Sequence, residues 1–178
     1  LTSARPGVGV EDMRPLIDLV GDAKVVGLGE STHGAAELFT MKHRLIEFLV
    51  TELGFTACAF EASHAGSQPI DEYVRRGLGD PAAALTGQGY IAWDNVEVAA
   101  LVGWLRDHNA GVEQKRRVAF WGLDTGYNSA GRRIVTDYLQ RTAPDLQSSA
   151  ERAFSLLDQL EPKWPFQLND PSYEPNLL

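Results

Sequence analysis

A glutamate and a histidine stand three positions apart in the segment GESTHG, residues 29–34 of this 178-residue chain. A carboxylate beside an imidazole can orient the ring and raise its basicity, as a general base requires to take a proton from water. We therefore interpret His33 as a candidate catalytic base and Glu30 as its partner. The alternative interpretation is a histidine that only helps to cap the helix that follows.

Two more acids end apolar runs in the same way as Glu30 ends VVGLGE. Glu61 ends ACAFE, and Asp124 ends VAFWGLD. Buried parallel strands are near-continuous apolar runs, and ligands of open parallel sheets bind beyond the carboxyl ends of the strands. If the three runs are neighbouring strands, the three carboxylates meet in one crevice. Close carboxylates raise one another's pKa, so that one of them can serve as a general acid near neutral pH.

Four further side chains are candidates to contact a substrate at this crevice. Lys42 and Arg44 follow on the helix after GESTHG, where a cation can stabilise a developing oxyanion. For Arg44 an ordinary surface ion pair is an equal alternative. His64 comes just after the second acid, and Trp93 lies at a predicted junction of loop and helix, where it can line a pocket.

A metal site is the main competing hypothesis. Glu30, His33 and Glu37 lie at i, i+3 and i+7, and the spacing of His33 and Glu37 places two ligands on one helix face. The remaining ligands are not evident, so we predict neither a metal nor a cofactor. His43 and Glu47 repeat the i, i+4 spacing, which we interpret as a solvated pair.

The elements that must position these residues follow from the apolar periodicity. Strands are predicted at residues 25–29, 56–60 and 118–123. Between the first two, apolar side chains recur at three- and four-residue steps until Gly54, which indicates a helix and a right-handed βαβ unit. The predicted fold is α/β, with a parallel sheet of at least three strands flanked by helices. Three strands make a thin sheet, so we expect this to be part of a larger α/β fold.

The rest of the chain divides into a glycine-rich stretch, three helices and a tail. Residues 63–92 are punctuated by glycine and proline, which is typical of a substrate-facing loop. Helices are predicted at residues 95–108, 132–141 and 147–160. Residues 1–160 are therefore predicted to form one α/β hydrolytic domain. The last eighteen residues, 161–178, contain four prolines and are predicted to be an irregular tail.

Composition limits the classes of partner. A net charge of −8 argues against nucleic acid, since phosphate binding needs clustered lysine and arginine. No stretch approaches the roughly 20 apolar residues that cross a bilayer, so we expect no membrane association. Cys58 is the one cysteine, which excludes an internal disulfide and fits a buried free thiol in a cytoplasmic protein. The oligomeric state is left open.

Several ordered motifs together resemble the erythromycin esterase family. They are GESTHG, ELGFTACAFEA, WDNVEVAALVGWLRDHN and VAFWGLD, and the resemblance covers roughly residues 10–160. It implies the N-terminal part of an α/β enzyme that hydrolyses an ester. In the best-known members the ester is the macrolactone of a macrolide antibiotic, and hydrolysis gives antibiotic resistance.

The resemblance also implies roles for individual residues. The histidine of the family's GE-x-x-H turn corresponds to His33 and activates water as a general base, without a covalent intermediate. The glutamates correspond to Glu30 and Glu61. Macrolide-cleaving members carry an arginine on the first helix where this chain has Lys42, which lacks the bidentate fork of arginine. A second active-site histidine lies in the C-terminal half of the longer members, and nothing after Asn128 matches that part.

We therefore expect a hydrolase that cleaves a carboxylic ester of a small molecule, with a macrolide lactone as one candidate. His33, Glu30 and Glu61 are the expected catalytic residues. The substrate-binding candidates are Lys42, Arg44, His64, Trp93 and Asp124. Two alternatives stay open: a metal-dependent hydrolase, and a non-catalytic ligand-binding domain.

Overall fold

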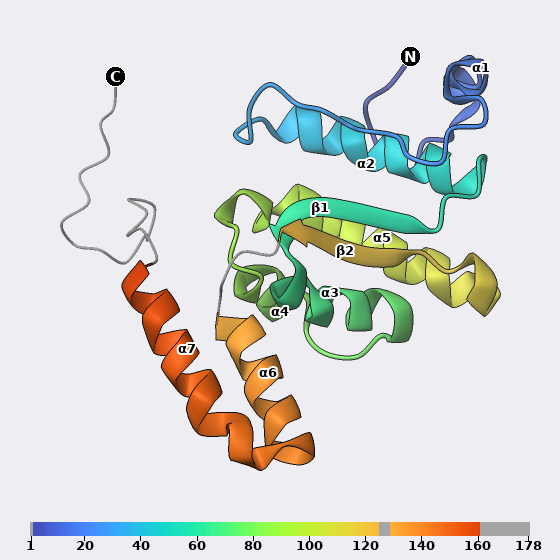
Figure 1. The fold of residues 1–178 in the computed structure, drawn as a ribbon. Coiled ribbons are helices and arrows are strands. Elements are labelled where there is room, and N and C mark those ends of the chain that lie inside the picture. Colours follow the sequence, from blue (N-terminus) through green and yellow to red (C-terminus); the bar gives the residue numbers. More distant parts are fainter. Residues whose placement is uncertain (1, 125–128, 161–178) are drawn as a thin grey trace, which may run out of the picture. The chain divides into compact units, whose positions relative to one another are not determined.

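The computed structural model describes residues 2–124 and 129–160 (Figure 1). The chain divides into two compact units, Leu1–Asn128 and Ser129–Leu178, which we describe one at a time. Both strands and all the predicted site residues belong to the first unit. The division falls inside the predicted domain 1–160, and the predicted tail 161–178 lies outside the described residues.

The first unit contains two strands, β1 (Ala57–Ser63) and β2 (Ala119–Asp124), and both α-helices and short 3₁₀ helices, labelled η. In chain order the helices are η1 (Glu11–Met13), α1 (Leu16–Val20), α2 (Ala36–Thr51), α3 (His64–Arg76), α4 (Pro81–Gly87), η2 (Ile91–Trp93), α5 (Val96–Gly111) and η3 (Gln114–Arg116). In Figure 1, α2 and α3 lie on opposite sides of the strand pair. The stretch 63–92, expected to contain short helical pieces broken by proline and glycine, is largely helical.

The two strands are parallel and neighbouring, as the sequence predicts. Ala57 pairs with Ala119, and the register runs regularly to Phe60 and Gly122 before an irregularity in β1. The α/β class is therefore correct. The described residues form a sheet of two strands, so the expected larger sheet of at least three strands is not confirmed.

The strand predicted at residues 25–29 is an extended segment without regular structure. Val26 and Leu28 are half-buried and pack against the core, whereas Val25 is 85% exposed. Half-buried and exposed residues therefore alternate along this segment, as they do in a strand. A strand also requires a neighbouring backbone for its hydrogen bonds, and residues 25–29 form no ladder with β1 or β2.

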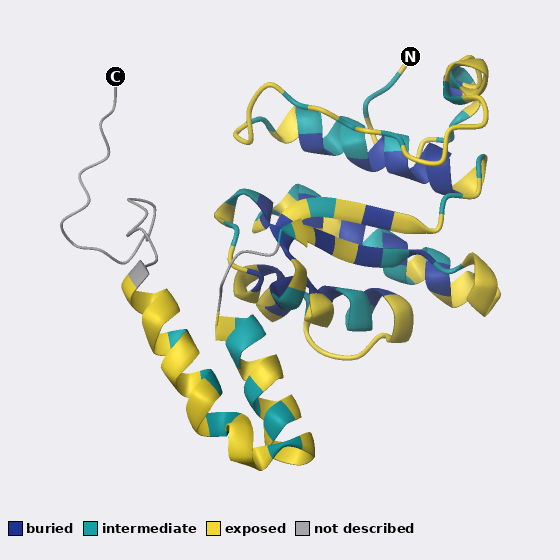
Figure 2. Ribbon diagram, viewed as in Figure 1, coloured by how far each residue is buried: buried dark blue, intermediate teal, exposed yellow. Residues whose placement is uncertain are grey.

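The main core packs around the strand pair and includes buried residues of α2, α3, α4 and α5 (Figure 2). Alternate residues of each strand face it, so Cys58 and Phe120 are buried while Ala59 and Trp121 are exposed. Buried residues of the helices complete it: Ile70 and Val74 of α3, Ala84 and Leu85 of α4, and Val98, Leu101, Val102 and Leu105 of α5. The prediction that Cys58 is a buried free thiol is confirmed.

The described part of the second unit, residues 129–160, is a pair of helices, α6 (Ser129–Thr142) and α7 (Gln147–Leu160), joined through η4 (Pro144–Leu146). The helices predicted at 132–141 and 147–160 are confirmed. No side chain described in α6 or α7 is buried. None of the helices in the described ranges is both long and apolar enough to cross a membrane.

Candidate active site

The side chains of His33 and Lys42 meet the carboxylate of Glu30. Its carboxylate oxygen Oε1 lies 2.6 Å from Nδ1 of His33, and Oε2 lies 2.6 Å from Nζ of Lys42. The side chain of Glu30 is only 6% exposed and that of Lys42 17%, whereas that of His33 is 54% exposed. A buried carboxylate therefore holds an imidazole whose other nitrogen, Nε2, is left for solvent or substrate.

The electrostatics of this cluster keep Glu30 ionised. Burial acts to raise the pKa of its carboxyl group, but the neighbouring Lys42 and His33 outweigh it, and the net pKa lies below the ordinary value. A carboxylate at Nδ1 favours the tautomer with the proton on that nitrogen. The lone pair of His33 is then on Nε2, as a general base requires.

The start of α2 positions this cluster. His33 lies in the segment before the helix, and Ala35 is the residue at its N-cap. Lys42 lies about two turns into α2, on the helix face that reaches back to Glu30. Residues 25–29 form no strand, so Glu30 does not lie at a strand end. Its side-chain contacts with His33 and Lys42 hold it at the site.

Trp93 connects this cluster to β1. Its indole lies edge-to-face with the His33 ring, with centroids 5.0 Å apart, and its Nε1–H donates a hydrogen bond of 2.7 Å to the carbonyl oxygen of Glu61. Trp93 is 5% exposed, so it belongs to the core as much as to the site. That Trp93 also lines a pocket for substrate stays a prediction.

Glu61 and Asp124 do not join Glu30 directly. β1 continues two residues past Glu61, whose side chain is exposed, so the contact with the site runs through its backbone carbonyl. Asp124 is the last residue of β2 and accepts a hydrogen bond from the hydroxyl group of Tyr90. Tyr90 is not among the predicted site residues, and the only available signal for it in the sequence is its place three residues before Trp93.

Arg44 lies in the interior, away from the candidate site cluster. It is 2% exposed, and its guanidinium group pairs with both carboxylate oxygens of Asp12 and donates to the carbonyl oxygens of Ser3 and Gly9. These hydrogen bonds hold the pKa of Asp12 well below its ordinary range. The arrangement indicates that Arg44 anchors the N-terminal segment onto α2, in place of the substrate contact that we had expected.

His64 and His43 lie in different surroundings, and the predicted substrate contact of His64 stays a prediction. His64, the first residue of α3, stacks on the ring of Trp121 with centroids 5.5 Å apart. His43 and Glu47, expected to be a solvated pair, are both buried, with Nε2 and Oε1 3.5 Å apart. The solvated pair was a wrong prediction, because α2 turns this face toward the N-terminal segment, whose Gly7 N–H donates to Glu47.

The described residues include no group of three or more histidine, cysteine, aspartate or glutamate side chains arranged to hold a metal ion. Glu37, the third member of the possible metal triad, is exposed in the first turn of α2.

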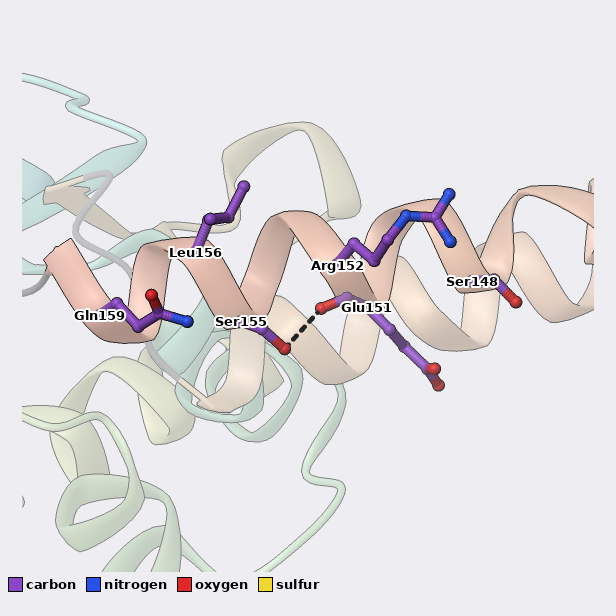
Figure 3. Close-up of a pocket in the computed structure, with 6 residues that line it drawn as sticks. All are labelled: Ser148, Glu151, Arg152, Ser155, Leu156 and Gln159. Carbon is purple, nitrogen blue, oxygen red and sulfur yellow. Dashed lines mark hydrogen bonds between the residues drawn. The ribbon is translucent and has the colours of Figure 1, made fainter.

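In the second unit, Figure 3 shows a pocket along α7 that contains none of the predicted site residues. It is lined by Ser148, Glu151, Arg152, Ser155, Leu156 and Gln159.

Comparison with known proteins shows which family this chain belongs to. The family model of erythromycin esterase matches residues 50–172. The chain belongs to the erythromycin esterase family. It is 28% identical to erythromycin esterase type II of Escherichia coli over 161 residues, which cover 88% of this chain and 37% of that protein.

Two solved structures have a similar fold. A crystal structure of a succinoglycan biosynthesis protein is 36% identical, with a TM-score of 0.75, and the match covers 89% of this chain and 40% of that one. A Bacillus cereus protein is 33% identical, with a TM-score of 0.73, over 88% of this chain and 38% of that one. The chain thus spans about two-fifths of the length of these relatives.

Proposed function

We propose that this chain carries the water-activating half of an esterase site, with His33 as the general base. The observation that supports this proposal is the 2.6 Å contact between Nδ1 of a solvent-exposed imidazole and a buried carboxylate. Membership of the erythromycin esterase family supports hydrolysis as the reaction. The substrate class is a small-molecule carboxylic ester, and a macrolide lactone is the specific candidate.

In the proposed reaction a water molecule attacks the ester carbonyl carbon while Nε2 of His33 takes one of its protons. The tetrahedral intermediate collapses by breaking the bond between the carbonyl carbon and the alkoxide oxygen, which receives the proton from His33. The products are a carboxylic acid and an alcohol, and no covalent bond to the protein forms. Glu30 stabilises the imidazolium that exists between the two proton transfers.

Lys42 has a different role here from the oxyanion contact that we first expected. Its ammonium group lies 2.6 Å from Glu30, so its charge is used to keep that carboxylate ionised. Asp124, held by Tyr90, and the exposed Glu61 side chain are the proposed substrate contacts at the carboxyl ends of the two strands.

The test is hydrolysis of a panel of simple aryl esters and macrolides by the wild-type chain, by His33→Ala and by a matched control, His108→Ala. His108 lies near the end of α5, where its ring stacks on Trp104. We expect His33→Ala to lower kcat by at least about a hundredfold, which is the usual contribution of a general base to the rate. The control His108→Ala should retain activity. Hydrolysis undiminished in His33→Ala contradicts the proposal. Saturable ligand binding without hydrolysis, unaffected by His33→Ala, supports the binding-domain alternative instead.

A further inference from the structure

The ring of His33 has few constraints for a residue with a catalytic role. It lies in a segment without regular structure before α2, and its side chain is 54% exposed. Its ring interacts with the carboxylate of Glu30 at Nδ1 and, edge-to-face, with the indole of Trp93. A single hydrogen bond fixes one ring atom but not the plane of the ring, so the second contact decides where Nε2 points.

Trp93 is suited to fix that plane because it is itself held from several directions. Phe39 of α2 and Phe60 of β1 both lie edge-to-face with its indole, with centroid separations of 5.8 and 5.3 Å. The hydrogen bond to the Glu61 carbonyl fixes the remaining rotation of the indole. A side chain so constrained cannot follow a moving imidazole, and the imidazole must instead adapt to it.

We infer that Trp93 is a positioning residue that holds the His33 imidazole in its working orientation. The inference rests on the proposed role of His33 as the base. It is separate from the substrate contact predicted for Trp93, and it gives Glu61 a second function through its carbonyl oxygen. The hydrogen bond from Trp93 connects the position of the base to strand β1, which also carries the exposed carboxylate of Glu61.

Nuclear magnetic resonance of the wild-type chain, labelled with ¹⁵N in histidine, tests this inference without any need for turnover. We expect nuclear Overhauser contacts between the rings of His33 and Trp93, and a His33 tautomer with its proton on Nδ1. The variant His33→Gln lacks this imidazole, so the ¹⁵N signals absent from its spectrum are those of His33. Absence of these ring contacts in the wild-type chain would overturn the inference.

Variants then separate positioning from general loosening of the core. In Trp93→Leu the ring of His33 should become mobile. Its tautomer population should shift toward the Nε2–H form that free imidazole prefers, and its signals should become narrower. Trp93→Phe should give an intermediate shift, since a smaller ring remains but the hydrogen bond to Glu61 is lost. The matched control is Trp104→Leu, which removes an indole that contacts His43 and His108 instead.

An unchanged His33 spectrum in folded Trp93→Leu contradicts the inference, and so does an equal change in Trp104→Leu. If Trp93→Leu does not fold, Trp93→Phe supplies the same comparison. Where the chain hydrolyses an ester, Trp93→Phe should lower kcat about tenfold with a smaller change in KM, as expected for misplacement of a base. A chain that hydrolyses nothing but shows the expected spectra contradicts the proposed function and leaves the positioning contact established.

Discussion

Burial gives similar residues of this protein different chemical roles. His33 and His43 each lie beside a glutamate. His33 precedes α2 and is exposed, whereas His43 lies within α2 and is buried. Lys42 and Arg44 are two positions apart on the same helix, and one pairs with Glu30 while the other anchors Asp12. A residue's type and spacing suggest several roles, and the environment of its side chain selects among them.

A pH-dependent stability follows from His43. Burial lowers its pKa to about 4, from an ordinary value of 6.5. Between these values the unfolded chain binds one more proton than the folded chain. The contribution of neutral His43 to stability is therefore complete above pH 6.5 and is lost as the pH falls toward 4, at up to about 1.4 kcal/mol per pH unit.

The measurement is urea denaturation of the wild-type chain and of His43→Leu at several pH values from 4.5 to 7.5. The free energy of unfolding of the wild type should fall faster with decreasing pH than that of the variant. If the free energy of unfolding of the wild type instead rises relative to that of His43→Leu at low pH, the folded state holds the His43 imidazole protonated. The cause would be Glu47, whose Oε1 lies 3.5 Å away.

At the scale of elements, the close approach of β1 and β2 determines where the strand-end residues lie. The regular register ends after Phe60 and Gly122, and β1 reaches Ser63 opposite Asp124. This irregularity leaves Glu61 before the strand end, with its carbonyl directed to Trp93. Ser63 then caps α3 by accepting a hydrogen bond from the N–H of Gly66.

Gly122 permits this approach. A Cβ atom there would lie 2.5 Å from the carbonyl oxygen of Ala62 and still closer to that of Ser63, and backbone atoms cannot rotate away. We expect Gly122→Ala to lower the free energy of unfolding by roughly 1–3 kcal/mol, as overpacking does.

The matched control is Gly103→Ala in α5, where an added Cβ meets nothing within 4 Å. Here we expect a gain of up to about 1 kcal/mol, because alanine favours a helix more than glycine does. Urea denaturation followed by tryptophan fluorescence measures both variants. Equal effects of the two substitutions would contradict the role given to Gly122.

At the scale of the whole molecule, the described core belongs to one of the two units. Every buried apolar side chain that the structure describes lies within residues 13–120, in Leu1–Asn128. Helices α6 and α7 bury none of their described side chains. The relatives that the chain matches are about two and a half times as long, since it covers 37–40% of three of them.

We therefore expect the chain ending at residue 128 to fold without residues 129–178. Its thermal unfolding should stay cooperative, with a Tm within about 5 °C of the full chain, because its hydrophobic core is intact. Circular dichroism measures both the transition and the lost helix signal of α6 and α7. A shortened chain without a cooperative transition would show that the second unit is needed for the core of the first.

The amino-acid sequence by itself determined the α/β class, two parallel strands, the helices α2, α5, α6 and α7, and the pairing of His33 with Glu30. These depend on apolar periodicity and on groups only three residues apart. Only the tertiary structure decided the rest. It left residues 25–29 without a strand neighbour, buried Arg44 and His43, and brought Trp93 from sixty residues away onto His33. Periodicity predicts which face of an element is buried, but not which distant side chain will cover it.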